Sequence, residues 1–367
     1  MSSDIIMVIV VGTALAFDFT NGFHDTANVV ATSISTRALA PKPAVALAAL
    51  LNFVGAFLSL KVAATVAQGF VETGAVTPTV VFAGLIGAIA WNLITWYFGL
   101  PSSSSHALIG GLVGSVLASA GSGAVEWQGL LDKLVVPAIV APLVAFGAAG
   151  LAILIVYRIV GRLRPGPVGR GFRLGQLASS SLLSLSHGTN DAQKTMGVIT
   201  LALVANGDIA ASNFHVPDWV VIAAASAIAL GTFVGGWRII RTLGTRIIKM
   251  DAPQGFAAQG AGAAVILAAS SAGFPLSTTH VISGSITGAG AAKRLSAVRW
   301  GVAGNIARAW ILTLPAAALF GAAVYEVSNR FGTGATGPIV ITLVLTATAT
   351  GLFARRQRQT MPSPATS

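Results

Sequence analysis

The chain has 367 residues, of which 54% are hydrophobic and only 9% are charged, and its mean hydropathy is +0.80. A soluble domain carries roughly 25% charged residues, so this composition argues against a soluble fold and predicts an all-α polytopic membrane protein. The absence of cysteine excludes disulfides and thiolate metal sites. The formal net charge of +11 does not predict nucleic-acid binding, because the Lys and Arg residues lie in short loops between apolar stretches.

Apolar stretches follow one another along the chain, and about 20 residues suffice to span a bilayer. They lie near residues 4–36, 43–63, 80–120, 133–157, 176–205, 219–237, 256–291, 300–325 and 336–354. The loops between them are either basic or acidic, and basic loops stay in the cytoplasm. This rule predicts a multi-pass protein of the cell membrane (plasma or inner), with the N-terminus outside and the C-terminus in the cytoplasm.

Two of the stretches are predicted to be re-entrant helical hairpins. Stretch 256–291 begins and ends at basic loops, and stretch 80–120 begins and ends at acidic loops. Each should therefore enter and leave the membrane on one side. The polar stretches 4–36 and 176–205 should each cross once, in opposite directions. Both exceed a simple span, so we expect each of them to be tilted or broken at its polar motif.

This layout predicts an inverted-topology repeat with broken helices. Residues 1–157 form the first repeat and 176–325 the second, joined by a basic cytoplasmic linker at 158–175. Residues 326–354 add a C-terminal transmembrane helix, and 355–367 form a disordered tail. Inverted repeats that meet near the membrane midplane are typical of secondary transporters. A coincidental duplication in a scaffold is the alternative, which the duplicated polar residues make less plausible.

The duplicated polar residues lie in two motifs, residues 21–28 and 186–194, which align on Asp25 and Asp191. A carboxylate at membrane depth is costly and usually functional. The partners that suit these carboxylates are cations, either Na⁺, for which both would be metal ligands, or a proton carried by the carboxyl. The predicted cation-coupling residues are Asn21, Asp25, Asn28, Asn190 and Asp191.

Each motif is followed by a hairpin tip with a Pro, three hydroxyl residues and a His. A helix start with free N–H groups and hydroxyl donors can hold an anion without a fixed charge, although Ser and Thr also cap helices in general. Lys194 either faces this anion or forms a salt bridge with Asp191 at i, i+3. The predicted anion ligands are Ser103, Ser104, Ser105, Ser277, Thr278, Thr279 and Lys194. Weaker site candidates are Asp18, His24, His106, His187, His280 and Gln259. For His106 and His280 we expect a structural role at the bend rather than contact with the anion or transfer of a proton.

These motifs resemble those of the inorganic phosphate transporter (PiT) family, and most closely its bacterial low-affinity carriers. The resemblance covers residues 1–354 and is carried by residues 19–28, 100–114, 186–197 and 274–288. It implies phosphate uptake coupled to Na⁺ or H⁺ in a homodimer within the lipid bilayer. It also implies a phosphate site at the two tips, cation ligation by the Asn/Asp motifs, and neither a cofactor nor an enzymatic activity.

The chain departs from the family pattern at His24, where much of the family has Asn, and at Gln259, where a glutamate is expected. The loss of amide and carboxylate oxygens weakens the case for two Na⁺ sites. The His24 variant resembles the bacterial carriers of the family, and this resemblance implies H⁺ coupling, with a neutral metal–phosphate complex as an alternative substrate. A carrier of another tetrahedral oxyanion such as sulfate is the nearest rival function. Sulfate needs only donors, whereas phosphate carries a proton that a carboxylate accepts. A membrane-embedded phosphoester enzyme using Ser105 and His106 fits poorly with two oppositely oriented copies.

Overall fold

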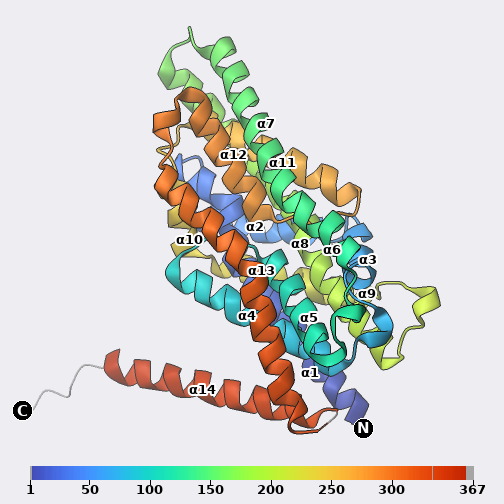
Figure 1. Cartoon of the computed structure of the whole chain (residues 1–367). Helices are drawn as coiled ribbons and strands as arrows, with labels where there is room; N and C mark the ends of the chain where they lie inside the picture. The colour runs from blue at the N-terminus through green and yellow to red at the C-terminus, as the bar shows by residue number, and fades with distance from the viewer. Residues whose placement is uncertain (1, 333, 361–367) are drawn as a thin grey trace, which may run out of the picture.

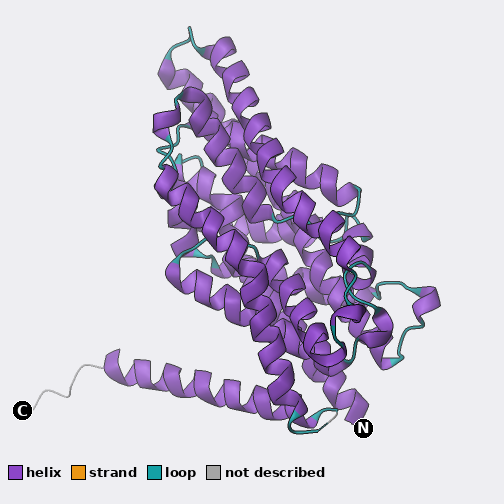
Figure 2. Cartoon of the chain, viewed as in Figure 1, coloured by secondary structure: helices purple, strands orange, loops and turns teal. Residues whose placement is uncertain are grey.

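The computed structural model describes residues 2–332 and 334–360, and Figure 2 shows that these residues are almost entirely helical. The single β contact within them is an isolated antiparallel bridge between Val71 and Val125. The predicted all-α fold of a polytopic membrane protein is therefore confirmed.

The first half of the chain begins with one long helix and continues with a broken helix, a helical hairpin and a second long helix. These elements are α1 (Ser2–Ser35), α2 (Pro41–Gly55), α3 (Lys61–Gln68), η1 (Thr73–Ala75), α4 (Pro78–Phe98), α5 (Ser104–Ala120), η2 (Ser122–Ala124), α6 (Trp127–Leu130), η3 (Leu131–Val135) and α7 (Val136–Val160).

The second half repeats this order. Its elements are α8 (Pro165–Asn206), η4 (Ala211–Asn213), α9 (Asp218–Val234), α10 (Trp237–Arg241), η5 (Thr242–Arg246), α11 (Ala252–Ser271), α12 (Thr278–Lys293), η6 (Leu295–Ala297) and α13 (Trp300–Asn329), and α14 (Thr336–Thr360) follows without a counterpart. Thus α1 corresponds to α8, the broken pair α2–α3 to α9–α10, and the hairpin α4–α5 to α11–α12.

The two halves interlock, because equivalent helices pack on elements of the other half. Helix α1 packs against α9 and α8 against α2, while α5 packs against α13 and α12 against α7 (Figure 1). A polar motif on α1 or α8 is therefore held between helices from both halves, and the central residues are buried.

Glycines allow the closest of these crossings. A Cβ on Gly231 of α9 would lie 2.1 Å from the Phe19 carbonyl oxygen of α1, and a Cβ on Gly188 of α8 would lie 2.1 Å from the Asn52 carbonyl oxygen of α2. Real Cβ contacts to backbone are far longer, so a side chain at either glycine would force the backbones apart. Gly22 and Gly188 occupy equivalent positions in the two motifs, and each lies at such a crossing.

The helices through the two motifs are not broken. Helix α1 runs unbroken from Ser2 to Ser35 and α8 from Pro165 to Asn206, so of the two alternatives for these stretches, tilted or broken at the motif, the break is excluded. The breaks lie elsewhere: α9 and the segment α10–η5 are bent by 59°. Most of the predicted linker 158–175 is also helical, since α7 continues to Val160 and α8 begins at Pro165.

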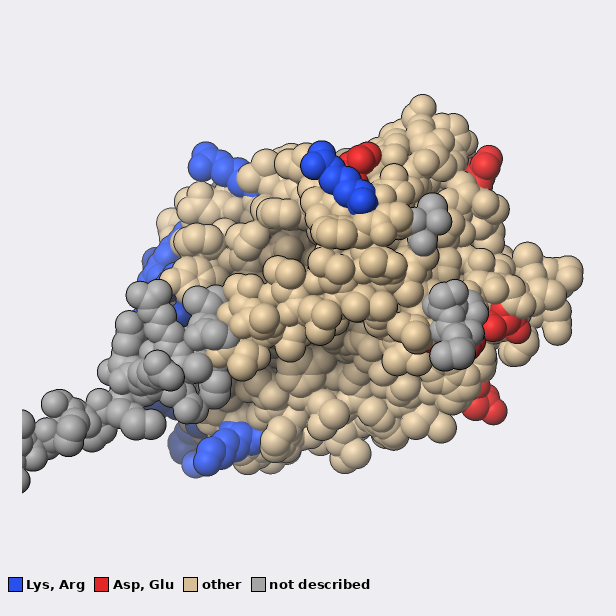
Figure 3. All heavy atoms as spheres, turned by 90° about the horizontal axis from the view of Figure 1, so that it is seen from below, with Lys and Arg blue, Asp and Glu red and all other residues tan. Residues whose placement is uncertain are grey.

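The surface of the described residues has the properties of a membrane protein. Four helices are long and apolar enough to span a bilayer, or five spans if the bent pair is counted as one. In Figure 3 much of the visible surface is uncharged, most of the Lys and Arg lie toward the left and most of the Asp and Glu toward the right, and one basic group lies beside an acidic one at the upper edge. Helix α14 continues to Thr360, beyond the predicted end at 354, and the rest of the predicted tail lies outside the described residues.

Candidate functional site

The tips of the two hairpins are built alike. Helix α4 ends at Phe98 and is followed by Gly99, whose φ of +64° suits glycine, and α5 begins after an extended turn with Ser103 as its N-cap. The Ser103 oxygen accepts from the His106 N–H at 3.1 Å. In the second hairpin Ser277 caps α12 by accepting from the His280 N–H at 3.3 Å. The first hydroxyl of each predicted trio therefore fixes the start of a helix, although its own O–H remains a potential donor.

The remaining hydroxyls face the two motif carboxylates, which are buried. The Ser104 hydroxyl donates to Asp25 Oδ2 at 2.7 Å, and the Thr278 hydroxyl donates to Asp191 Oδ2 at 3.1 Å. Thr279 also donates to Asp25, at 3.4 Å. The structure thus brings the predicted anion donors and the predicted cation ligands into one cluster.

Lys194 connects this cluster with both tips. Its ammonium, at a residue only 1% exposed, donates to an Asp191 carboxylate oxygen, to the Ser105 hydroxyl at 2.5 Å and to the Leu276 carbonyl at 2.7 Å. The sequence left two alternatives for Lys194, a salt bridge with Asp191 or a place facing the anion. The structure has the salt bridge, and it also places the ammonium at the hydroxyl tips.

Asn28 makes the equivalent link from the first motif. Its amide Nδ2 donates to Thr278 at 3.2 Å and to Thr279 at 2.9 Å, while Ser105 donates to the Leu276 carbonyl at 3.2 Å. These contacts hold the second tip against α1 and the first tip against the second.

Two buried histidines adjoin the carboxylates. His24 Nδ1 lies 2.7 Å from Asp25 Oδ1, and its Nε2 lies near Thr95 and Ser102 at 3.2 and 3.3 Å. His187 Nε2 lies 2.9 Å from Asp191 Oδ2. Both histidines, which the sequence ranked as weaker candidates, thus contact the residues that would couple a cation.

The hydrogen bonds around His187 define where its proton lies. The Thr232 hydroxyl donates to the Ile228 carbonyl, so it accepts from the Asn52 amide nitrogen at 2.8 Å. Asn52 therefore presents its oxygen to His187 Nδ1, 3.2 Å away, and this nitrogen carries a hydrogen. The other ring nitrogen, Nε2, lies 2.9 Å from Asp191 Oδ2 but makes no hydrogen bond among the described residues.

Several oxygen atoms in the same region make no hydrogen bond among the described residues. They are the side-chain carbonyl oxygens of Asn21, Asn28 and Asn190 and both carboxylate oxygens of Asp18. Asn21 and Thr195 face Asp18. Carboxylate and amide oxygens are the ligands that hard cations prefer. Asp25, His187 and Asp191 also offer three ligand atoms that all lie within 4.8 Å of one another, so a cation could be held there.

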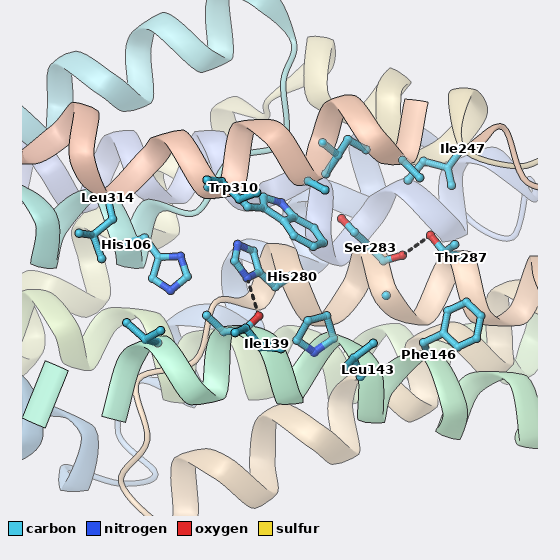
Figure 4. A pocket seen from close by; sticks show the side chains of 18 of the residues that line it. His106, Ile139, Leu143, Phe146, Ile247, His280, Ser283, Thr287, Trp310 and Leu314 are labelled. Atoms are coloured by element: carbon cyan, nitrogen blue, oxygen red, sulfur yellow. Dashed lines mark hydrogen bonds between the residues drawn. The ribbon is translucent and has the colours of Figure 1, made fainter. Parts of the chain in front are cut away.

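His106 and His280 lie next to each other, and neither ring makes a hydrogen bond with Asp25 or Asp191 among the described residues. Their ring centroids are 4.7 Å apart, and His280 stacks on Trp310 at 4.0 Å. Figure 4 shows both rings in a largely apolar cavity of about 710 Å³ between α7, α12 and α13. His280 Nδ1 lies 3.3 Å from the Ala138 carbonyl. These contacts support the structural role expected for the pair.

Gln259 is not brought to the tips. It accepts from Ser179 at 2.9 Å and donates to Ser33 at 2.7 Å, so it joins α11 to α8 and α1. The sequence missed Thr95 and Trp310, which contact the site from α4 and α13. The indole Nε1 of Trp310 donates to the Pro101 carbonyl of the first tip at 3.2 Å. A single Thr or Trp within an apolar stretch gave no sign of either contact.

A sequence profile described as the phosphate transporter family matches residues 21–168 and 162–321. These ranges cover most of the chain and include both motifs and both tips. The chain belongs to the phosphate transporter family.

Relatives in this family share much of the sequence. A protein of Mycobacterium tuberculosis (strain ATCC 25618 / H37Rv), named a probable low-affinity inorganic phosphate transporter, is 52% identical over 96% of this chain and 84% of its own length. Proteins of the same name from Rhizobium meliloti (strain 1021) and Bacillus subtilis (strain 168) are 52% and 45% identical, over 87% and 89% of this chain and 96% and 98% of their own lengths.

The fold is also similar to a solved structure entitled "The sodium-dependent phosphate transporter". The TM-score is 0.77 at 27% sequence identity, over 88% of this chain and 98% of that chain. Membership of this family makes the chain an integral membrane protein and a transporter rather than an enzyme.

Proposed function

We propose that this protein imports inorganic phosphate by symport with a cation, at a site between the two hairpin tips. One observation carries the proposal: the hydroxyls of Ser104, Thr278 and Thr279, which suit an anion, donate instead to Asp25 and Asp191. The anion donors and the carboxylates are therefore in direct contact, and a change at one must affect the other.

This contact gives a physical reason for coupling. When phosphate binds, the hydroxyls must turn from the carboxylates to the phosphate oxygens. Asp25 and Asp191 then lose hydrogen bonds and face a second anion in a buried site, and both effects are unfavourable. A cation or a proton at the carboxylates removes this cost. Each ligand therefore raises the affinity of the site for the other, which symport requires.

A proton is the coupling ion that we favour. His24 and His187 each place a ring nitrogen within 2.9 Å of a motif carboxylate, so a group that can carry a proton lies beside each carboxylate. The unpartnered amide oxygens of the motifs support Na⁺ as the alternative, as does the name of the sodium-dependent relative. A neutral metal–phosphate complex is a further form in which phosphate could enter.

The remaining parts of the proposal concern the membrane. We propose alternating access through two inverted repeats in the cell membrane, with the N-terminus outside and the C-terminus in the cytoplasm. The equivalent order of elements in the two halves and the separation of basic from acidic loops support this orientation. We further propose a homodimer, as the family resemblance implies.

The test is uptake of labelled phosphate into proteoliposomes that hold the purified protein. A pH gradient and a Na⁺ gradient are imposed separately, each at zero membrane potential, and unlabelled sulfate is added as a competitor. We expect a pH gradient, acidic outside, to drive accumulation that excess sulfate does not reduce. If neither gradient changes the rate of phosphate uptake, symport is refuted. Uptake driven only by the Na⁺ gradient would refute the proton as the coupling ion. If sulfate competes as strongly as unlabelled phosphate does, selectivity for phosphate is refuted.

A further inference from the structure

The two motifs differ at one equivalent position, three residues after the aspartate. The first copy has Asn28 after Asp25, and the second has Lys194 after Asp191. Both side chains are buried and both reach a hairpin tip. The site therefore has two similar halves, of which only the second contains a fixed positive charge at this position.

Lys194 is surrounded by the kinds of oxygen atom that bind a hard cation. Its ammonium contacts a carboxylate oxygen of Asp191, the hydroxyl oxygen of Ser105 and the backbone carbonyl oxygen of Leu276. Na⁺ and similar ions are bound in proteins by the same three types of oxygen. A lysine ammonium is a compact point charge with three hydrogens, and here each hydrogen has an acceptor. The ammonium thus occupies a place that is built like a cation site.

The first half has the opposite arrangement. The Asn28 amide nitrogen donates to Thr278 and Thr279, and its carbonyl oxygen makes no hydrogen bond among the described residues. Asp25 contacts His24 and the hydroxyl of Ser104 and has no lysine or arginine partner in the described chain. An exchangeable cation or proton can therefore bind at Asp25.

We infer that the ammonium of Lys194 is a tethered substitute for one of two coupling cations. The inference rests on the proposed symport and extends it to the number of ions. Asp25 and Asp191 carry two negative charges, and Lys194 compensates one of them permanently. One exchangeable cation, bound at Asp25, then neutralises the other motif carboxylate. Asp18, a third buried carboxylate that also interacts with Asp191 and Lys194, lies outside this pair. The second half of the site needs no ion from solution.

The substitution Lys194→Asn tests this inference, because it gives the second motif the residue of the first and removes the tethered charge. Phosphate binding to the purified protein is measured at pH 8 in choline chloride or in NaCl of equal ionic strength, since choline is too large for the site. For the wild type we expect the same affinity in both salts, because the exchangeable ion that we favour at Asp25 is a proton. For the variant we expect affinity in choline to fall by about tenfold or more, within the usual range of coupling between sites, and to recover in NaCl or at pH 6.

Lys61→Asn is the matched control. The Lys61 ammonium also donates to a carbonyl oxygen of the second hairpin, that of Ser271 at the end of α11, at 2.9 Å, but Lys61 is exposed. This variant should bind phosphate like the wild type in both salts. A cation requirement in Lys61→Asn equal to that of Lys194→Asn would overturn the inference, because any lost lysine would then produce it.

Two further results would overturn the inference. In the first, Lys194→Asn binds phosphate in choline as well as the wild type does. In the second, a folded variant stays weak under every condition, which would make Lys194 a direct phosphate ligand. If Lys194→Asn does not fold, the double variant Asp191→Asn/Lys194→Asn replaces it, because it removes both charges. That variant should bind phosphate in choline, and its failure to do so when folded would refute the inference.

The two proposals fail in different ways. If the wild type neither binds nor transports phosphate, the proposed function is wrong. If the wild type transports phosphate and Lys194→Asn gains no requirement for Na⁺ or acid, only the inference about Lys194 is wrong.

Discussion

Asn28 and Thr279 lie 251 residues apart in the sequence, yet the amide nitrogen of Asn28 donates a 2.9 Å hydrogen bond to the Thr279 hydroxyl. Lys194 makes the reciprocal contact, from the second motif to Ser105 at the first tip. Each motif is therefore tied to the tip of the other half. Any rearrangement of one tip must change the surroundings of the opposite carboxylate, which suits a site where two ligands bind together.

Loss of either motif carboxylate should nearly abolish coupled transport. Asp25→Asn and Asp191→Asn remove the negative charge that a cation or proton would compensate. Asp191→Asn also leaves the buried ammonium of Lys194 without its carboxylate, which is strongly unfavourable. We expect gradient-driven phosphate uptake into proteoliposomes to fall by at least tenfold, a free-energy change of about 1.4 kcal/mol.

Asp132→Asn is the control for both substitutions. Asp132 is an exposed carboxylate that accepts from Gln128 at 2.7 Å and makes no hydrogen bond with either tip among the described residues. Uptake by this variant should equal that of the wild type. Full coupled uptake by both motif variants would show that the carboxylates were assigned the wrong role.

The hydroxyls of the first tip should separate into one that stabilises the fold and one that binds phosphate. Ser103 caps α5, so Ser103→Ala should lower stability by about 1 kcal/mol and change phosphate affinity little. Ser104 faces Asp25, so Ser104→Ala should weaken phosphate binding, by about tenfold if its hydroxyl donates to the bound anion. Thermal unfolding and phosphate titration of both variants check the difference. The same effect on affinity from both would contradict it.

The sequence was sufficient for the helical fold and for the pairing of motifs with tips, because duplicated polar residues in apolar stretches are visible without a structure. It did not locate the helix breaks. Helix α1 passes Asp25 unbroken because Ser104 and His24 satisfy the carboxylate by side-chain contacts, so no backbone groups need to be freed. Trp310 and Asn52 contact Pro101 and His187, which are distant from them in sequence, and a pattern along the chain does not predict such contacts.

The glycine crossing beside the second motif should tolerate no side chain. A Cβ at Gly188 would lie 2.1 Å from the backbone oxygen of Asn52, whereas one at Gly12 of α1 would meet nothing within 4 Å in the described residues. Gly188→Ala should therefore destabilise the protein by about 1–3 kcal/mol or more, since backbone atoms cannot move aside as a side chain can. Gly12→Ala should leave the unfolding temperature unchanged in the same detergent. Equal unfolding temperatures for the two variants would refute the close crossing.

Trp310 should act as a clamp on the two tips, because its indole donates to Pro101 of the first tip and its ring stacks on His280 of the second. Trp310→Phe keeps an aromatic ring and loses the hydrogen bond, whereas Trp310→Leu loses both contacts. A neutral hydrogen bond contributes about 1 kcal/mol and an aromatic pair a similar amount. We therefore expect phosphate affinity to fall by roughly fivefold in Trp310→Phe and further in Trp310→Leu.

The matched control for this clamp lies on the same helix. The indole of Trp300, at the start of α13, donates to the Leu295 carbonyl at 3.0 Å. Its side chain is exposed and, although it lines the same cavity as Trp310, it makes no hydrogen bond or ring contact with either tip among the described residues. Trp300→Phe loses an indole hydrogen bond of the same kind and should bind phosphate like the wild type. Titration of all three variants separates a contact at the tips from a general loss of stability. If Trp310→Leu binds phosphate as tightly as Trp300→Phe, α13 does not position the tips through Trp310.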